Sequence, residues 1–197
     1  MSAGKRVVRF NYWLDPAFDR IVGAAPGILL QTCAMQGADD AAWSALAHAQ
    51  VLQITAAKDE LPRHWFVTAE LLARCPQLLA VSSSGSGCDT IDIDACTRAG
   101  VVVMNQAGGN ADSVAELALG LMLAVLRRIP ESDALLRSAK RGFSREDLMG
   151  HELRGRTLGL VGVGEAGSRV AALGRAFGMQ VLGVDPALDA AQMAARG

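Results

Sequence analysis

A glycine-rich segment is the part of the sequence whose residue types and spacing are best suited to chemistry. Gly162, Gly164 and Gly167 form a G-x-G-x-x-G pattern directly after the apolar run 157–161. In a strand–turn–helix unit the first glycine permits a tight turn, the second lets a pyrophosphate approach the backbone, and the third lets helix and strand pack closely. The helix N-terminus adds amide donors and the positive end of the helix dipole. The pattern therefore predicts a site for a dinucleotide.

An acidic residue follows the next predicted strand. Asp185 comes directly after the run 180–184. A carboxylate at this point can accept hydrogen bonds from both ribose hydroxyls and would repel a 2′-phosphate, so NAD is favoured over NADP. Methyltransferases also place glycines after a first strand and an acid after the second, so their methyl donor is an alternative ligand. A second alternative is that the glycines serve only the turn and the packing.

The elements that precede this segment alternate between short apolar runs and helical patterns. We expect strands over 6–10, 28–32, 51–54, 78–82 and 101–104, and helices over 16–24, 40–47, 69–74 and 93–99. Thr68 and Asp92 are expected helix N-caps, and Gly100 is an expected helix end. This alternation predicts a parallel sheet with right-handed crossovers. Residues 1–107 are therefore predicted to form one α/β domain, and residues 108–197 a second.

The predicted second domain begins with an unusual helix. Residues 114–126 are apolar on nearly every side, so we expect this helix to be covered on all sides, as between two domains. Ser113 and Glu116 have the spacing of a capping box, and Pro130 is expected to end the helix. A more polar helix over 131–140 follows. The strand 157–161, a helix over 168–177 and the strand 180–184 then complete the glycine-rich unit.

Composition excludes several classes of protein. The 197 residues carry a net charge of −1, which provides no basic surface for nucleic acid. The longest uncharged stretch, 21–38, is interrupted by glycines and a proline, so no membrane span is expected. The four cysteines stand singly, without the spacing of a zinc site, and no metal is expected. The first 15 residues lack the core of a signal peptide, so we expect a cytoplasmic protein with reduced thiols.

From residue 78 onward the sequence resembles the D-isomer-specific 2-hydroxyacid dehydrogenases. The motifs that carry the resemblance are Gly85-Ser86-Gly87-Cys88-Asp89 followed by Ile91-Asp92, then Gly109-Asn110 with Ser113-Val114-Ala115-Glu116, the glycine-rich segment itself, Phe177-Gly178-Met179, and Asp185-Pro186. The resemblance implies a flavodoxin-like parallel-sheet substrate domain followed by the first part of a Rossmann dinucleotide-binding domain. It further implies NAD-dependent oxidation of a D-2-hydroxy acid, or reduction of the corresponding 2-oxo acid.

The resemblance assigns substrate contacts to two loops. The substrate carboxylate would be held by the backbone amides of Ser86 and Gly87 in the loop that begins at Gly85, and Asn110 would touch the substrate. Two consecutive amides after glycines can form an anion-binding nest. Considered without the resemblance, the first segment is an ordinary loop and Asn110 a helix-capping residue. Ser83 stands where phosphoglycerate-type members commonly carry an arginine, so we expect an unphosphorylated acid.

The resemblance also assigns cofactor contacts. Val114 would line the nicotinamide, although it could equally be a core residue. Glu165 and Ala166 stand where many members carry Arg-Ile, and Pro186 follows the ribose-binding acid. A glutamate so close to a pyrophosphate should weaken binding unless its side chain turns away toward solvent.

The catalytic residues of the family have no counterpart in this sequence. Members use an arginine, a glutamate and a histidine that come later in the chain, whereas His48, His64 and His151 match none of these positions and are expected at the surface or at helix ends. We therefore expect an N-terminal portion of a longer, homodimeric enzyme. Residues 114–126 and 131–147 are candidate dimer contacts, and the equal alternative is that they pack within the same chain against the rest of the enzyme. Alone, this N-terminal portion should bind the adenosine half of NAD weakly and catalyse nothing. The alternative is a non-catalytic, NAD-sensing corepressor-like relative.

Overall fold

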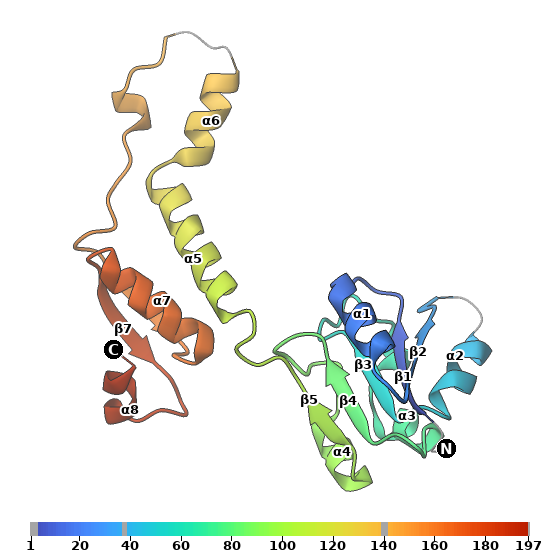
Figure 1. Cartoon of the computed structure of the whole chain (residues 1–197). Coiled ribbons are helices and arrows are strands. Elements are labelled where there is room, and N and C mark those ends of the chain that lie inside the picture. The colour runs from blue at the N-terminus through green and yellow to red at the C-terminus, as the bar shows by residue number, and fades with distance from the viewer. Residues whose placement is uncertain (1–3, 37–38, 139–141, 197) are drawn as a thin grey trace. The chain divides into compact units, whose positions relative to one another are not determined.

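The computed structural model describes residues 4–36, 39–138 and 142–196. The chain divides into two compact units, residues 1–107 and 108–197, each built around its own parallel sheet (Figure 1). No helix in the described ranges is long and apolar enough to cross a membrane.

Unit 1, residues 1–107, contains a sheet of five parallel strands. They are β1 (Lys5–Phe10), β2 (Ile28–Cys33), β3 (Val51–Ile54), β4 (Ala80–Ser83) and β5 (Val102–Met104). Their order is β2-β1-β3-β4-β5, and every pair is parallel. This is the flavodoxin-like order, in which ligands bind at the carboxyl ends of the strands. The predicted fold class is confirmed.

The helices of unit 1 begin at residues that can cap them. They are α1 (Pro16–Ala24), α2 (Asp39–Leu46), α3 (Ala69–Arg74) and α4 (Ile93–Ala99), with a short 3₁₀ turn, η1 (Arg63–Trp65). Thr68 Oγ1 accepts a hydrogen bond from the Leu71 amide at 3.4 Å, and Asp92 Oδ1 accepts one from the Ala95 amide at 2.8 Å. Gly100 ends α4 at φ +70°. Both predicted caps and the predicted helix end are confirmed.

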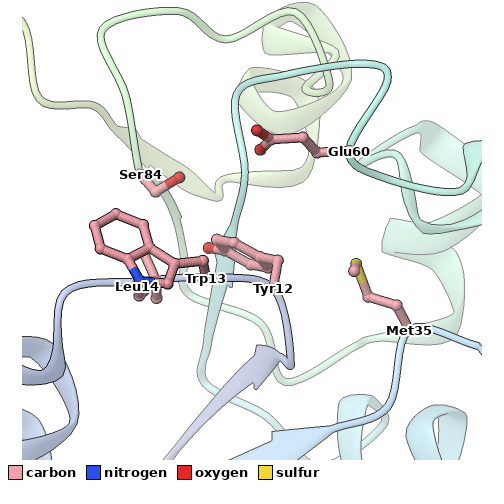
Figure 2. Close-up of a pocket in the computed structure, with 6 residues that line it drawn as sticks. All are labelled: Tyr12, Trp13, Leu14, Met35, Glu60 and Ser84. Carbon is pink, nitrogen blue, oxygen red and sulfur yellow. The ribbon is translucent and has the colours of Figure 1, made fainter.

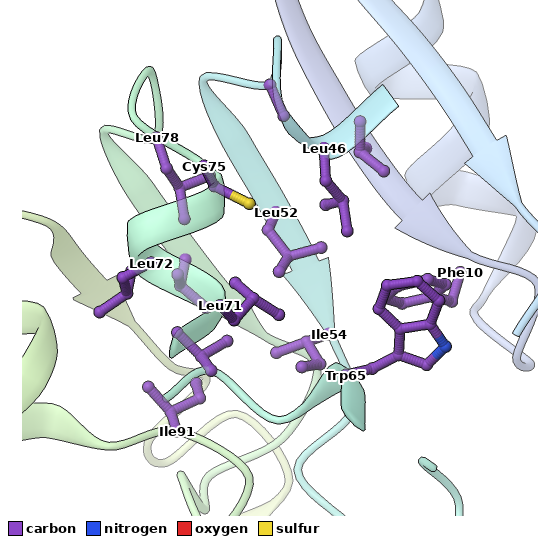
Figure 3. Close-up of a cluster of buried hydrophobic side chains, with 14 of the residues drawn as sticks. Phe10, Leu46, Leu52, Ile54, Trp65, Leu71, Leu72, Cys75, Leu78 and Ile91 are labelled. Carbon is purple, nitrogen blue, oxygen red and sulfur yellow. The ribbon is translucent and has the colours of Figure 1, made fainter. Parts of the chain in front are cut away.

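One aromatic cluster organises the core of unit 1. Trp65 is completely buried, and its ring centroid lies 4.8 Å from that of Phe10 (Figure 3). The ring centroid of Trp43 also lies 4.8 Å from that of Trp65. The same buried cluster contains the completely buried Leu46, Leu52, Ile54 and Val81 and the nearly completely buried Leu71. This core fixes the strands whose carboxyl ends carry the loops described below.

Unit 2, residues 108–197, is a helical arm followed by a strand–helix–strand unit. The elements are α5 (Ala111–Leu126), α6 (Ile129–Arg137), the 3₁₀ turn η2 (Glu146–Leu148), β6 (Thr157–Val161), α7 (Glu165–Ala176), β7 (Gln180–Val184) and α8 (Ala190–Ala195). Strands β6 and β7 pair in parallel over their full length. Leu119, Leu153 and Met179 form the buried cluster of this unit, which joins α5 to the strand–helix–strand unit.

Helix α5 differs from its prediction in two ways. It begins at Ala111, with Asn110 in the N-cap position, so Ser113 lies inside the first turn and the predicted Ser113–Glu116 capping box is wrong. The second difference concerns burial, since the helix was predicted to be buried on all sides. Within unit 2 one face of α5 packs on α7, whereas Leu117 is 63% exposed and Val125 is 72% exposed.

Three further boundaries were misplaced. Pro130 does not end α5, which stops at Leu126; it lies in the first turn of α6, where a missing amide costs nothing. Arg128, at φ +53°, separates the two helices. Helix α6 ends at Arg137, and positions 139 and 140 of its prediction lie outside the described residues. Helix α7 starts at Glu165 rather than at residue 168, directly after the glycines.

Candidate dinucleotide and substrate site

The glycine-rich loop joins β6 to α7 in a conformation that requires glycine at two positions. Gly162 has φ +90°, and its amide donates to the Val184 carbonyl at 2.7 Å. A Cβ on Gly167 would lie 2.2 Å from the Gly162 carbonyl oxygen, so helix and loop meet without room for a side chain. A Cβ on Gly164 would meet no protein atom within 4 Å. Space next to the backbone is therefore open at the position expected to face a pyrophosphate.

Asp185 is attached to this loop by hydrogen bonds. Its Oδ2 accepts from the Val163 amide at 2.8 Å, and its Oδ1 accepts from the Ala187 amide at 2.9 Å. These two backbone donors hold the pKa of the carboxyl below its ordinary value, so Asp185 is ionised at neutral pH. Arg196 Nη1 donates to the Val163 carbonyl at 2.6 Å, which places a cation beside the same loop.

The residues of this loop fit the adenosine ribose and the diphosphate of a dinucleotide. A carboxylate offers about four lone pairs, and the two backbone amides occupy two of them, so each oxygen of Asp185 can still accept from a ribose hydroxyl. Helix α7 begins directly after Gly164, and its first amides are positioned for phosphate oxygens. Ala166 lies half-buried in that first turn, and Pro186 is exposed after Asp185.

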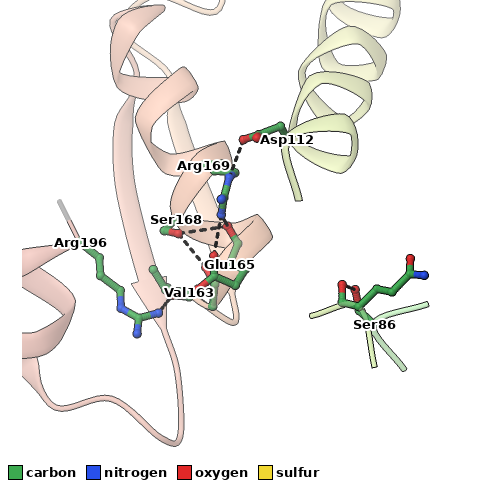
Figure 4. A network of polar contacts seen from close by, with 9 residues as sticks. Ser86, Asp112, Val163, Glu165, Ser168, Arg169 and Arg196 are labelled. Atoms are coloured by element: carbon green, nitrogen blue, oxygen red, sulfur yellow. Dashed lines mark hydrogen bonds and ion pairs between the residues drawn. The ribbon is translucent and has the colours of Figure 1, made fainter. Parts of the chain in front are cut away.

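Glu165 is held by an arginine of its own helix. Arg169 Nη1 donates to Glu165 Oε2 and to the Glu165 carbonyl oxygen, both at 2.8 Å (Figure 4). Arg169 Nε donates to Asp112 of α5, so one guanidinium bridges two carboxylates. The hydrogen bond from Arg169 lowers the pKa of Glu165. The Glu165 carboxylate is therefore charged and paired with Arg169, and its side chain is 64% exposed.

The predicted substrate loop of unit 1 is fixed through its carbonyl groups. The Gly85 carbonyl accepts from the Gln106 amide at 3.0 Å, and the Ser86 carbonyl accepts from Asn105 Nδ2 at 2.9 Å. The Gly87 carbonyl accepts from the Ser83 hydroxyl at 2.7 Å. Since three successive carbonyls are held by protein donors, the orientation of the peptide planes, and hence of the amides between them, is set by the fold.

Ser83 has a structural role at the base of this loop. It is the last residue of β4 and is completely buried, and its hydroxyl closes the loop through Gly87. A Cβ on Gly85 would lie 3.2 Å from the Cβ of Ala56, so the loop packs tightly on the segment after β3.

A cavity of about 440 Å³ adjoins this loop at the carboxyl ends of the unit 1 strands. Its lining residues are Tyr12, Trp13, Leu14, Met35, Glu60 and Ser84 (Figure 2). The walls are mainly apolar and aromatic, and Glu60 is the charged residue among them. Burial raises the pKa of Tyr12, whose hydroxyl accepts from Gln53 Nε2 at 3.4 Å.

The remaining predicted site residues lie on α5 or outside the two loops. Asn110 occupies the N-cap position of α5, and Val114 is 43% exposed one turn later. His48 Nδ1 lies 3.0 Å from the Ser44 carbonyl, the His64 ring packs on Trp65 with centroids 4.6 Å apart, and His151 is exposed. Among the described residues no group of three His, Cys, Asp or Glu side chains could hold a metal ion.

Comparison with known proteins decides the family. Residues 119–197 match the model of the D-isomer specific 2-hydroxyacid dehydrogenase NAD binding domain. The chain therefore carries the NAD binding domain of the D-isomer specific 2-hydroxyacid dehydrogenases over residues 119–197. The matched segment contains the glycine-rich loop and Asp185, and NAD is the cofactor of this domain. The resemblance noted in the sequence and the predicted cofactor are confirmed.

Individual 2-hydroxyacid dehydrogenases are similar to parts of the chain. D-3-phosphoglycerate dehydrogenase of Rattus norvegicus is 42% identical over 123 residues, which are 62% of this chain and 23% of the rat protein. The enzyme of the same name from Archaeoglobus fulgidus is 46% identical over 121 residues, which are 61% of this chain and 22% of that protein. The chain thus spans less than a quarter of the length of these curated relatives.

The fold is also that of a solved 2-hydroxyacid dehydrogenase. D-lactate dehydrogenase of Aquifex aeolicus, solved with NAD and lactic acid, superposes with a TM-score of 0.76 at 24% identity. The superposition covers 97% of this chain and 54% of that one.

Sequence reasoning missed three charged residues around the glycine-rich loop. Arg169 could have been found, because it stands four residues after Glu165 on a predicted helix, where side chains meet. Asp112 and Arg196 gave no such signal, because their contacts depend on how α5 and α8 fold back onto the strand–helix–strand unit.

Proposed function

We propose that this chain forms part of an NAD-dependent oxidoreductase that acts on the CH–OH group of a D-2-hydroxy acid, or on the corresponding 2-oxo acid in the reverse direction. The observation that supports this most strongly is Asp185, which is bonded to the amide of Val163 inside the G-x-G-x-x-G loop. Bound NAD would supply the hydride chemistry. The chain would hold the adenosine half, with Asp185 on the ribose and the first turn of α7 on the diphosphate.

Unit 1 is proposed to hold the organic acid. The amides of Ser86 and Gly87 would bind its carboxylate, because the fixed carbonyls of this loop set the direction of those amides. Asn110 would contact the substrate and Val114 the nicotinamide, as the family resemblance implies. The side chain of the acid would enter the adjoining cavity. Since the cavity is lined by aromatic and apolar groups with Glu60, it suits an unphosphorylated acid and disfavours a phosphate.

The chemical step requires an acid for the alkoxide oxygen and a cation for the carbonyl. None of the three histidines lies in the glycine-rich loop or lines the cavity next to the substrate loop. We therefore propose that the 197-residue chain alone binds ligand without turnover. As the family resemblance implies, we also propose that the full-length protein is a homodimer, and that it is cytoplasmic. The second candidate is a non-catalytic NAD-sensing protein, which would use the same glycine-rich loop and Asp185 to bind NAD.

Two measurements test the proposal. Titration calorimetry of the 197-residue chain should show NAD binding that is tighter than NADP binding and is weakened about tenfold by Asp185→Ala, the loss of one charged hydrogen-bonding group. A chain that binds S-adenosylmethionine but not NAD would refute the cofactor site. Steady NAD reduction by the purified 197-residue chain with D-2-hydroxy acids would refute the claim that it is inactive alone.

A further inference from the structure

Glu165 places a negative charge at the position where the proposed site must receive a diphosphate. It is the first residue of α7 and follows Gly164 directly. The N-terminus of a helix attracts any nearby anion, so a carboxylate at this position and a bound diphosphate would compete for the same amides. A device that moves the carboxylate aside would remove this competition.

The geometry of Arg169 provides such a device. One nitrogen of its guanidinium contacts both the side chain and the carbonyl of Glu165, so the carboxylate is drawn back along the helix axis toward the second turn. The carboxylate then lies beside the chain that leads into α5, where a Cβ on Gly108 would be 3.6 Å from Glu165 Oε2.

Asp112 fixes the arginine in this position. Arg169 Nε donates to the Asp112 carboxylate, which belongs to the first turn of α5, and α5 and α7 are packed against each other. The Arg169 side chain is 35% exposed, whereas those of Glu165 and Asp112 are 64% and 80% exposed. The cation is thus the more enclosed member of a three-residue network (Figure 4). A simple exposed pair along one helix stabilises that helix only slightly and would not require the second acid.

We propose that Arg169 is a positioning residue of the cofactor site, which acts by holding the Glu165 carboxylate away from the path of the NAD diphosphate. This inference rests on the proposed NAD site. Because the Arg169 guanidinium is bound to the carboxylates of Glu165 and Asp112, we do not assign it a direct contact with the phosphates. Removing Arg169 would leave two adjacent carboxylates without their cation, and Glu165 could then turn to the helix N-terminus.

The test is a double-mutant cycle on the 197-residue chain, with NAD affinity measured by titration calorimetry. Arg169→Gln should weaken NAD binding about tenfold. This is the effect expected when the released Glu165 carboxylate lies about 6 Å from a phosphate charge at an effective dielectric constant of about 40. Glu165→Gln should bind at least as tightly as the parent chain. The NAD affinity of the double variant Glu165→Gln/Arg169→Gln should lie within about twofold of that of the parent chain, because the Glu165 carboxylate is no longer present to repel the diphosphate. Arg175→Gln, at the other end of α7, is the matched control and should change nothing.

Salt provides a readout that a merely structural role would not move. The Arg169→Gln defect should shrink in about 1 M NaCl, where the screening length falls to about 3 Å. A double variant as weak as Arg169→Gln would overturn the proposal, since Arg169 would then contact the diphosphate itself or only support the fold. Unchanged affinity in Arg169→Gln would overturn it as well. If the parent chain binds no NAD, the proposed cofactor site fails and this inference fails with it.

Discussion

The third glycine of the loop offers a sharp test of the structure. In Gly167→Ala the new Cβ would lie 2.2 Å from the Gly162 carbonyl oxygen, whereas ordinary contacts begin near 3.4 Å. The obstacle is backbone rather than a side chain that can rotate away, so the loop and the start of α7 must separate by about 1.2 Å. That movement strains the Gly162–Val184 hydrogen bond, which measures 2.7 Å.

The energy of this change can be worked out from opposing terms. Overpacking of this kind costs about 2–3 kcal/mol. Replacing glycine by alanine inside a helix stabilises the folded state by about 1 kcal/mol, because alanine has the higher helix propensity. The net loss of about 1–2 kcal/mol corresponds to a fall in melting temperature of about 8 °C for a unit of this size.

The assay can assign the loss to unit 2. Trp13, Trp43 and Trp65 all belong to unit 1, so tryptophan fluorescence follows that unit alone, whereas far-UV circular dichroism follows both. Gly167→Ala should shift the dichroism transition and leave the fluorescence transition in place. Gly164→Ala is the matched variant: its Cβ meets no protein atom, so stability should hold while NAD affinity falls at least about tenfold. A Gly167→Ala chain with parental stability, or a Gly164→Ala chain with parental affinity, would refute the reasoning.

Three further outcomes are expected. Folding lowers the pKa of Asp185, so the stability that this carboxylate contributes is complete above the ordinary carboxyl pKa of about 4 and is lost as pH falls through the lowered folded value. Asp185→Asn should therefore make the stability of unit 2, followed by far-UV circular dichroism, less dependent on pH between about pH 2 and 5. An unchanged pH dependence would contradict this. Burial raises the pKa of Cys75 to about 11, so iodoacetamide at pH 8 should label it far more slowly than the half-buried Cys88, as peptide mass mapping would show. Asp92→Ala removes the hydrogen bond to the Ala95 amide and should cost about 1 kcal/mol, visible as a lower urea midpoint by tryptophan fluorescence; an unchanged midpoint would show that the cap contributes nothing.

Local chemistry was enough to predict much of the fold. Helix α1 was bounded correctly because Pro16 favours the first helical position and Asp15 caps it through the Ala17 amide. Strands β6 and β7 were also bounded correctly, since short apolar runs next to glycines leave few alternatives. In these segments the signal lies within a few residues of the boundary.

Predictions failed where two local signals competed. Ser113 and Glu116 have capping-box spacing, yet the chain turns earlier, at Gly108, which has φ +79°, and the helix begins three residues before the predicted start. Likewise α7 starts directly after Gly164, so the third glycine of the pattern, Gly167, lies in the first turn of the helix and not in the loop. A pattern that is correct for a cap does not exclude a helix that has already begun.

The candidate site was only partly accessible from sequence. The glycine-rich loop and Asp185 follow from spacing along one strand–helix–strand unit, which also matches the family model. The Asp112–Arg169 contact joins residues 57 positions apart, and the cavity next to Ser84 gathers side chains that follow β1, β2, β3 and β4. Contacts of this kind depend on tertiary packing, and no local pattern encodes them.

If the proposed function is taken as the starting point, the burial of Ser83 restricts which substitutions could change the substrate. An arginine at this position, as in phosphoglycerate-type members, would replace a completely buried hydroxyl and remove the hydrogen bond that closes the loop at Gly87. The first mutational step toward a phosphorylated substrate would therefore place an unpaired charge in the interior before it offered any new contact. For the proposed function, a change of substrate would have to start at the exposed cavity-lining residues Trp13 or Glu60 and reach Ser83 only afterwards.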